Sequence, residues 1–550
     1  MSDKAFFEVK EKDVLGRIGV IETPHGKIET PAFAPVINPL KQIISPSEIL
    51  EMGFNLLMTN SFIILRRYGE YGEEIGVHKI LGVESPVMTD SGAYQLMEYG
   101  YVDVSPEEII KYQEKIGSDI CIILDIPTRY HTSREQAVLE VEETIRRARR
   151  ALAIREREDM LLLAPVQGGR HYDLVEYSAR QLSQLPFEIY GIGGPTQIME
   201  QYIFDELIQL VLTAKVNLPV SKPLHLFGAG HPMLLALMVA LGVDTFDSAS
   251  YILYAEKGRY MTPWGTYRIE DLKYFPCNCP TCRKHSPNDL KDMPKEEEVR
   301  LLAQHNLYAL LSEINTIKQA IIEGDLWNLV EHRVSSHPKL KRAILKIEKY
   351  LPYIEEHSPL TRGKITGIFF LDNLSKNRVE VYRHRKKILG DYPLKGKKVA
   401  LLLPETMEKP FHRFGPIARF YKRLLEEYRQ LANKVEILVY APLFGLIPIH
   451  IDDSYPLSQY EGPYTITENI ADDAIHLTIE FIRRNLPTIT ALVVCWDDER
   501  WGIDTGKKLE FELKKLGIKY RIIKCLPNEV DKEPCFDRIV GTIASLLFVK

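Results

Sequence analysis

The chain has 550 residues, of which 45% are hydrophobic and 26% charged, and its formal net charge is −5. This composition is typical of a folded globular protein with a sizeable core, and the length predicts roughly two to four domains unless one of them is a large barrel. The charge gives no global reason to expect a polyanionic partner, so any nucleic-acid-binding surface must be a local patch.

The first residues show neither a positively charged leader followed by an apolar run nor any other targeting signal. No apolar stretch approaches the roughly 18 residues that a membrane span needs. We therefore expect a cytoplasmic protein that does not contact a membrane.

Residues 1–30 contain turn signals and are predicted to form a small antiparallel leader. After it, short apolar runs rich in β-formers alternate with helical stretches. The runs occupy residues 31–38, 54–60, 86–90, 120–125, 160–167, 188–193, 223–228 and 243–247. Eight such repeats are typical of a closed parallel (β/α)8 TIM barrel, an α/β fold. An open doubly wound sheet is the alternative.

Helix-start signals support this alternation. Ser45 and Ser105 each precede a proline, and a glutamate follows three residues after each serine. A serine at the N-cap, a proline at the first helical position and a glutamate at the third are a typical start of a helix. We therefore expect helices to begin at residues 46 and 106.

A cysteine cluster follows the barrel repeats. Cys277, Cys279 and Cys282 lie within six residues, whereas Cys121, Cys495, Cys525 and Cys535 are scattered. This distribution favours a metal site over a disulfide framework. By spacing, the fourth ligand could be His285 or His305, the latter in a long amphipathic helix predicted over residues 296–322. Four protein ligands leave no open coordination position, so the metal would be a structural zinc ion.

The rest of the chain divides into a connecting segment and a second α/β region. Residues 341–396 are basic and irregular in pattern, which suggests a linker or a small connecting domain. Strands are then predicted at residues 398–403, 435–440, 491–495 and 520–523, with helices between them. We expect domains at 1–340, with the zinc site at about 274–310, at 341–396 and at 397–550, the last with a small parallel sheet and a C-terminal helix at 536–549. This last domain has no glycine-rich phosphate loop.

Polar residues and glycines end several of the barrel strands. In such barrels the catalytic groups sit at the carboxyl ends of the strands. These ends carry Asp90, Asp125, Gln167, Gly193, Gly194, Phe227 and Asp247. Taken singly, the glycines could serve tight turns and Phe227 could belong to the core. Together they predict a pocket for a flat, hydrogen-bonding ligand, with Asp90 and Asp247 as a carboxylate pair suited to glycosidic-bond chemistry.

Several motifs resemble those of the archaeal tRNA-guanine transglycosylases. They are residues 90–95, 166–169 and 246–251, together with the run from Tyr274 through the cysteines, and the resemblance covers about residues 10–320. It implies that Asp247 is the nucleophile and Asp90 the general acid/base. It further implies that His305 completes the zinc site, with one structural Zn²⁺ per subunit, and that the base is held by Asp125, Gln167, Gly194 and Phe227, with Tyr94 as a wall of the pocket.

The resemblance also implies an activity. The enzyme would exchange guanine at position 15 of the tRNA D arm for 7-cyano-7-deazaguanine (preQ0), through a covalent aspartyl-ribosyl intermediate, as a step of archaeosine biosynthesis. The partners would be tRNA and the two bases, and the implied assembly is a homodimer. Pro195 departs from the aliphatic residues usual after the family's glycine pair, and a proline removes a backbone donor beside the base.

Two alternatives and one departure remain. The C-terminal half also resembles archaeosine synthases, but the segment from Pro404 to Phe411 lacks the cysteine of their active motif, which argues against amidotransfer. A non-catalytic tRNA-binding subunit on the same barrel is the other alternative. The family often ends in a PUA-type RNA-binding domain, and we expect that module to be absent here or supplied by a separate PUA-domain protein.

Overall fold

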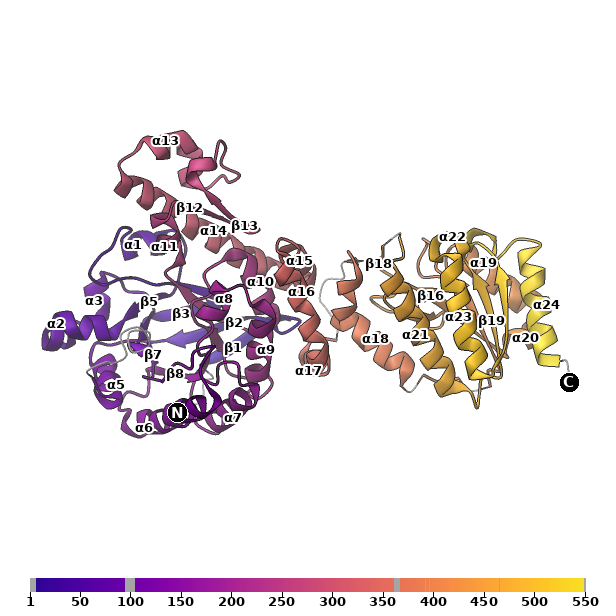
Figure 1. The fold of residues 1–550 in the computed structure, drawn as a ribbon, viewed down its shortest axis with the longest axis horizontal. Coiled ribbons are helices and arrows are strands. Elements are labelled where there is room, and N and C mark those ends of the chain that lie inside the picture. The colour runs from indigo at the N-terminus through magenta and orange to yellow at the C-terminus, as the bar shows by residue number, and fades with distance from the viewer. Residues whose placement is uncertain are drawn as a thin grey trace. The chain divides into compact units, whose positions relative to one another are not determined.

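The computed structural model describes residues 6–93, 104–360, 367–390, 392–394, 396–463 and 465–548. The chain forms two compact units, Met1–Gly363 and Lys364–Lys550, which Figure 1 colours from indigo to salmon and from orange to yellow. Among the described residues, no helix has the length and apolar character needed to cross a bilayer.

The first unit contains the predicted barrel. Its strands are β4 (Ala32–Pro35), β5 (Leu57–Asn60), β6 (Val87–Asp90), β7 (Ile120–Ile122), β8 (Leu161–Val166), β9 (Ile189–Ile192), β10 (Leu224–Leu226) and β11 (Thr245–Ser248). Neighbouring strands are parallel, and β11 pairs with β4. A parallel bridge between Val36 and Met58 joins the remaining two edges, β4 and β5. The (β/α)8 prediction is therefore confirmed, and the open sheet is wrong.

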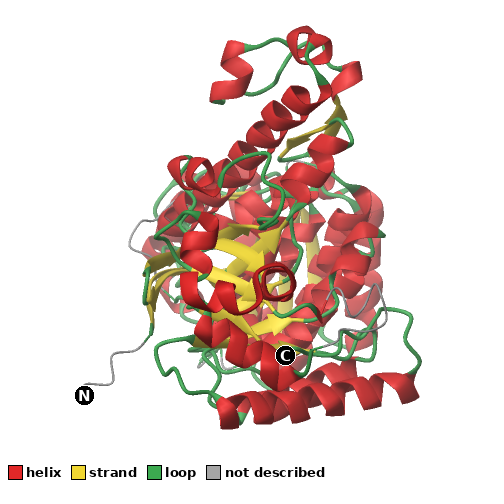
Figure 2. Cartoon of the chain, turned by 90° about the vertical axis from the view of Figure 1, so that its left-hand side faces the viewer, coloured by secondary structure: helices red, strands yellow, loops and turns green. Residues whose placement is uncertain are grey.

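Helices surround these strands, as Figure 2 shows with red helices around the yellow strands of the unit that faces the viewer. Ser45 caps α1 (Pro46–Glu51), and Ser105 forms a capping box on α5 (Pro106–Lys115), as the sequence predicted. The other barrel helices are α2 (Ser61–Ile75), α3 (Val77–Leu81), α6 (Arg134–Ile154), α7 (Tyr172–Ser183), α8 (Thr196–Glu200), α9 (Phe204–Lys215), α10 (Pro232–Ala240) and α11 (Ser250–Glu256).

The leader closes one end of the barrel. β1 (Phe7–Asp13), β2 (Gly16–Thr23) and β3 (Gly26–Thr30) form the predicted antiparallel sheet. Phe7, Ile21 and Ile28 join a single hydrophobic cluster with side chains from the starts of the barrel strands, among them Ile120 and Ile189. The amino ends of the strands are therefore plugged, which leaves the carboxyl ends for a site.

The segment after β11 carries the cysteines and then continues as helices. β12 (Arg259–Thr262) and β13 (Gly265–Arg268) form a hairpin, and the long helix predicted at 296–322 is α14 (Lys295–Glu323). The other elements are η1 (Ile269–Asp271), α12 (Pro280–Lys284), α13 (Pro287–Asp292), α15 (Leu326–Val334), α16 (Pro338–Ala343), η2 (Ile344–Tyr350) and α17 (Leu351–His357). Residues 341–357, which looked irregular, are thus helical, because Ile344, Ile347 and Ile354 recur on one buried face.

The second unit is an α/β layer structure. Its sheet has the order β17-β16-β15-β19-β20, formed by β15 (Val399–Pro404), β16 (Val435–Ala441), β17 (Gly445–Pro448), β19 (Ala491–Trp496) and β20 (Lys519–Lys524). The sequence predicted about four parallel strands and missed β17, which is antiparallel to β16. The chain reverses between β16 and β17, in a turn where Leu443 has a positive φ of 65°.

Helices cover the sheet of the second unit, and buried clusters lie on both its faces. These elements are η3 (Asn373–Asn377), α18 (Val379–Leu389), α19 (Gly415–Glu427), α20 (Arg429–Ala432), α21 (Glu468–Asn485), α22 (Asp498–Trp501), α23 (Ile503–Leu516), η4 (Pro527–Glu529) and α24 (Cys535–Phe548). β14 (Ile368–Phe369) and β18 (Tyr460–Glu461) form a separate parallel pair. The predicted C-terminal helix is α24.

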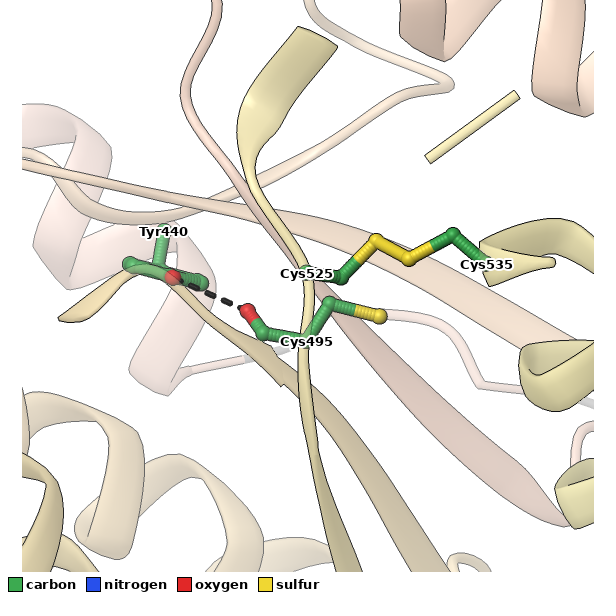
Figure 3. Close-up of a disulfide and its surroundings, with 4 residues drawn as sticks. All are labelled: Tyr440, Cys495, Cys525 and Cys535. Atoms are coloured by element: carbon green, nitrogen blue, oxygen red, sulfur yellow. Dashed lines mark hydrogen bonds between the residues drawn. A yellow bond between two sulfur atoms is a disulfide. The ribbon is translucent and has the colours of Figure 1, made fainter. Parts of the chain in front are cut away.

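A disulfide joins Cys525, just after β20, to Cys535 at the start of α24 (Figure 3). In the sequence both residues look like scattered cysteines, and their spacing did not predict this link. Figure 3 also shows the free Cys495 on β19, whose carbonyl oxygen accepts a hydrogen bond of 2.9 Å from the Tyr440 hydroxyl.

Candidate active site

A cavity of about 1160 Å³ opens at the carboxyl ends of the barrel strands. The residues that line it include six of the seven predicted for catalysis or base binding: Asp90, Asp125, Gln167, Gly194, Phe227 and Asp247. The seventh, Tyr94, lies outside the described residues. Strands that are far apart in the sequence therefore bring these side chains to one cavity.

Asp247 is a buried carboxylate near the end of β11, with 7% of its surface exposed. Its Oδ1 accepts hydrogen bonds from His225 Nε2 at 3.0 Å and from the backbone N–H of Gly228 at 3.0 Å. Donors of this kind stabilise the charged form of a carboxylate. Two N–H donors therefore hold one oxygen of the Asp247 carboxyl group in place inside the cavity.

Asp90 ends β6 and lies in a different environment. Its Oδ2 accepts hydrogen bonds from Asn60 Nδ2 at 2.7 Å and from the backbone N–H of Gly92 at 3.3 Å. The pKa of Asp90 is raised to about 7, mainly by burial and then by the charges of Asp125 and, to a smaller extent, Asp247, while the Gly92 N–H opposes the rise. A carboxyl group with this pKa can both give and take a proton near neutral pH.

Asp125 and Gln167 form a second polar pair on the cavity wall. The Gln167 amide is oriented by the backbone N–H of Thr128, which donates to Oε1 at 2.9 Å, and its Nε2 donates to Asp125 Oδ2. Burial raises the pKa of Asp125 to about 6, and the hydrogen bond from Gln167 opposes this shift. The pair brings carboxylate acceptors and an amide donor to the cavity wall, which suits a ligand with a hydrogen-bonding edge.

The glycines beside this pair allow close packing of the protein itself. A Cβ on Gly193 would lie 2.1 Å from Gln167 Nε2, and one on Gly194 would lie 2.7 Å from the Thr128 carbonyl oxygen. Gly194 also has a positive φ of 69°. Pro195 follows as the N-cap of α8 and lines the cavity, so its missing N–H lies at the site, as the sequence indicated.

Two residues of the site were not singled out from the sequence. Asn60 ends β5 as Asp90 ends β6, and the two residues are register partners. The position of Asn60 at a strand end could therefore have indicated a site residue. His225 lies within the run that became β10 and is fully buried. A histidine inside an apolar run is typical of a core residue, and only the register of β10 with β11 reveals its partner.

The four predicted metal ligands come together. Ligand atoms of Cys277, Cys279, Cys282 and His305 all lie within 4.8 Å of one another. His305 Nδ1 is 3.6 Å from Cys279 Sγ and 3.5 Å from Cys282 Sγ. Three thiols and one imidazole fit a tetrahedral metal ion, and the group can hold one. His285, the alternative ligand, is not part of it.

A second layer of contacts fixes the His305 ring. Its Nε2 donates to the Met261 carbonyl oxygen at 2.9 Å, which leaves Nδ1 directed at the sulfurs. The Tyr260 ring stacks on it with a centroid distance of 3.5 Å. Orientation of a metal-binding histidine by a backbone carbonyl is usual in structural metal sites.

The basic residues near the barrel and in the second unit differ in their surroundings. Arg259 and the exposed Trp264, on the β12–β13 hairpin, line the cavity mouth together with Lys41, Arg129 and Lys257. The basic run at 382–387 instead lies on α18, where His384 is buried and Arg385 pairs with Asp473. Basic side chains therefore lie among the residues that line the cavity, together with the acidic Glu200 and Glu256.

Comparisons with known proteins bear on this geometry. Residues 12–339 match the family described as queuine tRNA-ribosyltransferase. The chain is 40% identical to a tRNA-guanine(15) transglycosylase of Sulfolobus acidocaldarius, over 89% of this chain and 95% of that protein. It is 44% identical to the protein of the same name from Methanocaldococcus jannaschii, over 83% and 68% of the two chains, and 43% identical to that of Pyrobaculum aerophilum, over 83% and 90%.

Proposed function

The chain belongs to the queuine tRNA-ribosyltransferase family, and from this premise we propose that it is a tRNA-guanine(15) transglycosylase. It replaces guanine at position 15 of tRNA with 7-cyano-7-deazaguanine, a step of archaeosine biosynthesis. One observation carries the proposal: a single cavity is lined both by Asp247, whose Oδ1 is held by two N–H donors, and by Asp90, whose pKa is raised to about 7.

In the first step, the ionised Asp247 attacks C1′ of the guanosine ribose. The new O–C1′ bond forms as the bond from C1′ to the base breaks, and the electron pair of that bond leaves with guanine. Asp90, whose raised pKa keeps it partly protonated at neutral pH, gives its proton to the departing base.

In the second step, the incoming base reverses these events. Asp90 takes a proton from 7-cyano-7-deazaguanine, whose ring nitrogen attacks C1′ and releases the Asp247 carboxylate. The overall result is a retaining double displacement. Asp125, Gln167, Gly194 and Phe227 hold both bases in turn, and Tyr94 is proposed as a further wall.

The substrate must deform to reach this cavity. A guanine that is stacked inside a folded tRNA cannot contact carboxylates at the end of a barrel, so it must be unstacked and turned out. Arg259, Lys257 and Arg129 at the mouth supply positive charge for the phosphates beside it. Binding should therefore weaken as the salt concentration rises.

The Cys277, Cys279, Cys282 and His305 group is proposed to hold one Zn²⁺ per subunit. With four protein ligands the ion serves only to hold the segment that follows β13. The homodimer and a separate PUA-type partner stay predictions from the resemblance.

The test follows incorporation of labelled guanine into unmodified tRNA, and then incorporation of 7-cyano-7-deazaguanine with mass spectrometry of the nucleoside at position 15. Exchange by the wild type that is lost in Asp247→Ala and Asp90→Ala supports the proposal. A wild type that binds tRNA without exchanging any base would instead support a non-catalytic tRNA-binding subunit.

A further inference from the structure

A chain of hydrogen bonds runs beneath the floor of the cavity to Asp247. His225 Nδ1 lies 2.9 Å from Thr245 Oγ1, and His225 Nε2 lies 3.0 Å from Asp247 Oδ1. Thr245 and Asp247 are two residues apart on β11 and therefore point to the same side of the strand. Thr245 is the register partner of His225 on β10.

The chemistry of the three groups determines the direction of these hydrogen bonds. An ionised carboxylate only accepts, so His225 Nε2 carries the hydrogen and donates it to Asp247. In a neutral imidazole Nδ1 is then the acceptor, and the Thr245 hydroxyl donates to it. Phe227 lies edge-on to the ring, at 4.6 Å between centroids, and restricts its rotation.

This arrangement gives the two carboxylate oxygens of Asp247 different surroundings. Oδ1 takes both donors, His225 Nε2 and the Gly228 N–H. Within the described part of the chain, no donor reaches Oδ2, and Asp247 lines the cavity. We infer that His225 is a positioning residue that holds Oδ1 and thereby assigns Oδ2 as the atom that bonds to ribose C1′. This inference rests on the proposed function.

The assignment is consistent with the change in charge during the reaction. When Oδ2 bonds to C1′, the carboxylate becomes an ester and Oδ1 becomes its carbonyl oxygen. A carbonyl oxygen still accepts hydrogen bonds, so the N–H groups of His225 and Gly228 keep their partner in both states. The departing base takes the electron pair from C1′, and no proton has to move through His225.

A buried histidine that merely fills space is the alternative. Many of the side chains that fill the barrel interior form an apolar cluster, including Ala34, Met88 and Leu163. An apolar residue would fit such a core without the cost of burying two ring nitrogens. His225 is fully buried, with both nitrogens within hydrogen-bonding distance of β11, and one of those bonds ends on the nucleophile.

Replacing His225 with amide side chains of two lengths tests the inference. In His225→Gln the amide nitrogen can occupy the position of Nε2 and still donate to Asp247. In His225→Asn the amide nitrogen stops near the position of Nδ1 and cannot reach. His332→Asn makes the same exchange at an exposed histidine of α15, outside this cavity, and serves as the control.

The measurements are kcat and KM for guanine exchange, and the rate at which a covalent enzyme–tRNA adduct appears on a denaturing gel. A hydrogen bond to a charged group corresponds to about a 30-fold change in rate, so we expect His225→Asn to lower kcat and the adduct rate by about that factor. KM for guanine should not change, because Asp125 and Gln167 are untouched. His225→Gln should recover to within about threefold of the wild type, and His332→Asn should equal it.

The outcomes separate the two proposals. A wild type that exchanges no base overturns the proposed function and this inference with it. Wild-type exchange together with an undiminished adduct rate in His225→Asn overturns this inference alone. Equal losses in the Gln and Asn variants, matched by equal losses in melting temperature, also overturn it, because they show a role in packing only.

Discussion

Both units place carboxylates where parallel strands end, but the surroundings of these carboxylates differ between the units. In the barrel unit, Asp90 and Asp247 face a cavity, and the pKa of Asp90 is raised to about 7. In the C-terminal unit, Glu405 follows β15 and accepts hydrogen bonds from the Tyr460 hydroxyl and from Arg500 Nη1, the latter at 2.9 Å, while Lys409 Nζ lies 3.5 Å away.

The difference shows that strand-end position alone does not make a site. Asp497, which follows β19, is likewise engaged: it caps α22 and accepts the backbone N–H groups of Glu499 and Arg500. Carboxylates that are neutralised by cations and backbone donors stabilise their surroundings. Asp90 instead faces the cavity, and its raised pKa suits it to proton transfer.

The largest expected effect sets Asp247→Asn against Glu405→Gln. The first variant removes the proposed nucleophile and should lower guanine exchange by about 10⁴-fold or more. The second should leave exchange within about twofold, and it should lower the free energy of unfolding by about 1–3 kcal/mol because Arg500 loses a charged partner. Exchange assays and urea denaturation of both variants make the comparison. Loss of exchange in Glu405→Gln at unchanged stability would contradict it.

The next largest effect is a loss of stability when the candidate metal group of the barrel unit is disrupted. Cys282→Ser and His305→Asn each remove one of four ligands, so the metal content should fall and the free energy of unfolding should drop by several kcal/mol, since binding of a structural metal contributes directly to folding. Elemental analysis and denaturation measure both. His285→Asn is the matched control, because this histidine lies outside the ligand group. Full metal content in His305→Asn would mean that the ligand set is wrong.

The C-terminal unit contains a disulfide, whereas the cysteines of the barrel unit are free. Cys535→Ser removes the disulfide to Cys525. The two cysteines are 10 residues apart in the sequence, so the disulfide closes a short loop. Its loss should lower the free energy of unfolding by about 2–3 kcal/mol. Exchange at the barrel should not change, and Cys495→Ser serves as a control for the loss of a thiol. Equal stability with and without a reductant in the wild type would count against the link.

The smallest effect is a pH dependence of stability at Asp90. Its pKa in the folded protein, about 7, lies above its ordinary value of 3.8, so the folded protein binds this proton more tightly than the unfolded chain. The resulting stabilisation is fully present below about pH 4 and is lost as the pH rises to about 7. Asp90→Asn abolishes this titration. The stability of the variant relative to wild type should therefore rise between pH 6 and pH 8, by about 1–2 kcal/mol.

Chemical denaturation at the two pH values measures this difference. Asp504→Asn, at an exposed carboxylate of the C-terminal unit that pairs with Lys507, is the control and should show no such rise. A difference between Asp90→Asn and wild type that does not vary with pH would mean that Asp90 is ordinary in its titration.

The sequence predicted most of the barrel and much of its site. Continuous apolar runs of β-formers located all eight strands, and their polar ends located Asp90, Asp125 and Asp247, because parallel strands share one edge. The cysteine spacing located three metal ligands, but left His285 and His305 open until the resemblance was considered. Such features are local, so they can be read from short stretches of sequence.

The features that the sequence did not predict depend on strand register and on contacts between segments that are far apart in the chain. His225 looks like a core residue until β10 is aligned with β11. The antiparallel β17 has four buried residues and no alternation, so nothing in its pattern distinguishes it from a loop that packs. The pairing of Cys525 with Cys535 requires knowing that α24 returns to the end of β20. Each of these contacts is fixed by tertiary packing and not by local preference.

The closure of the barrel has a consequence for how the protein becomes active. β11, which carries Asp247, pairs with β4, the first barrel strand, so Ala32 meets Thr245 across almost the whole barrel sequence. Contacts between such distant segments are slow to form, because a long loop must close first. During synthesis from the N-terminus, Asp247 therefore takes its place in the cavity wall only after the other seven barrel strands have been made. A nascent chain could bury its first seven strands and still be unable to cut a glycosidic bond.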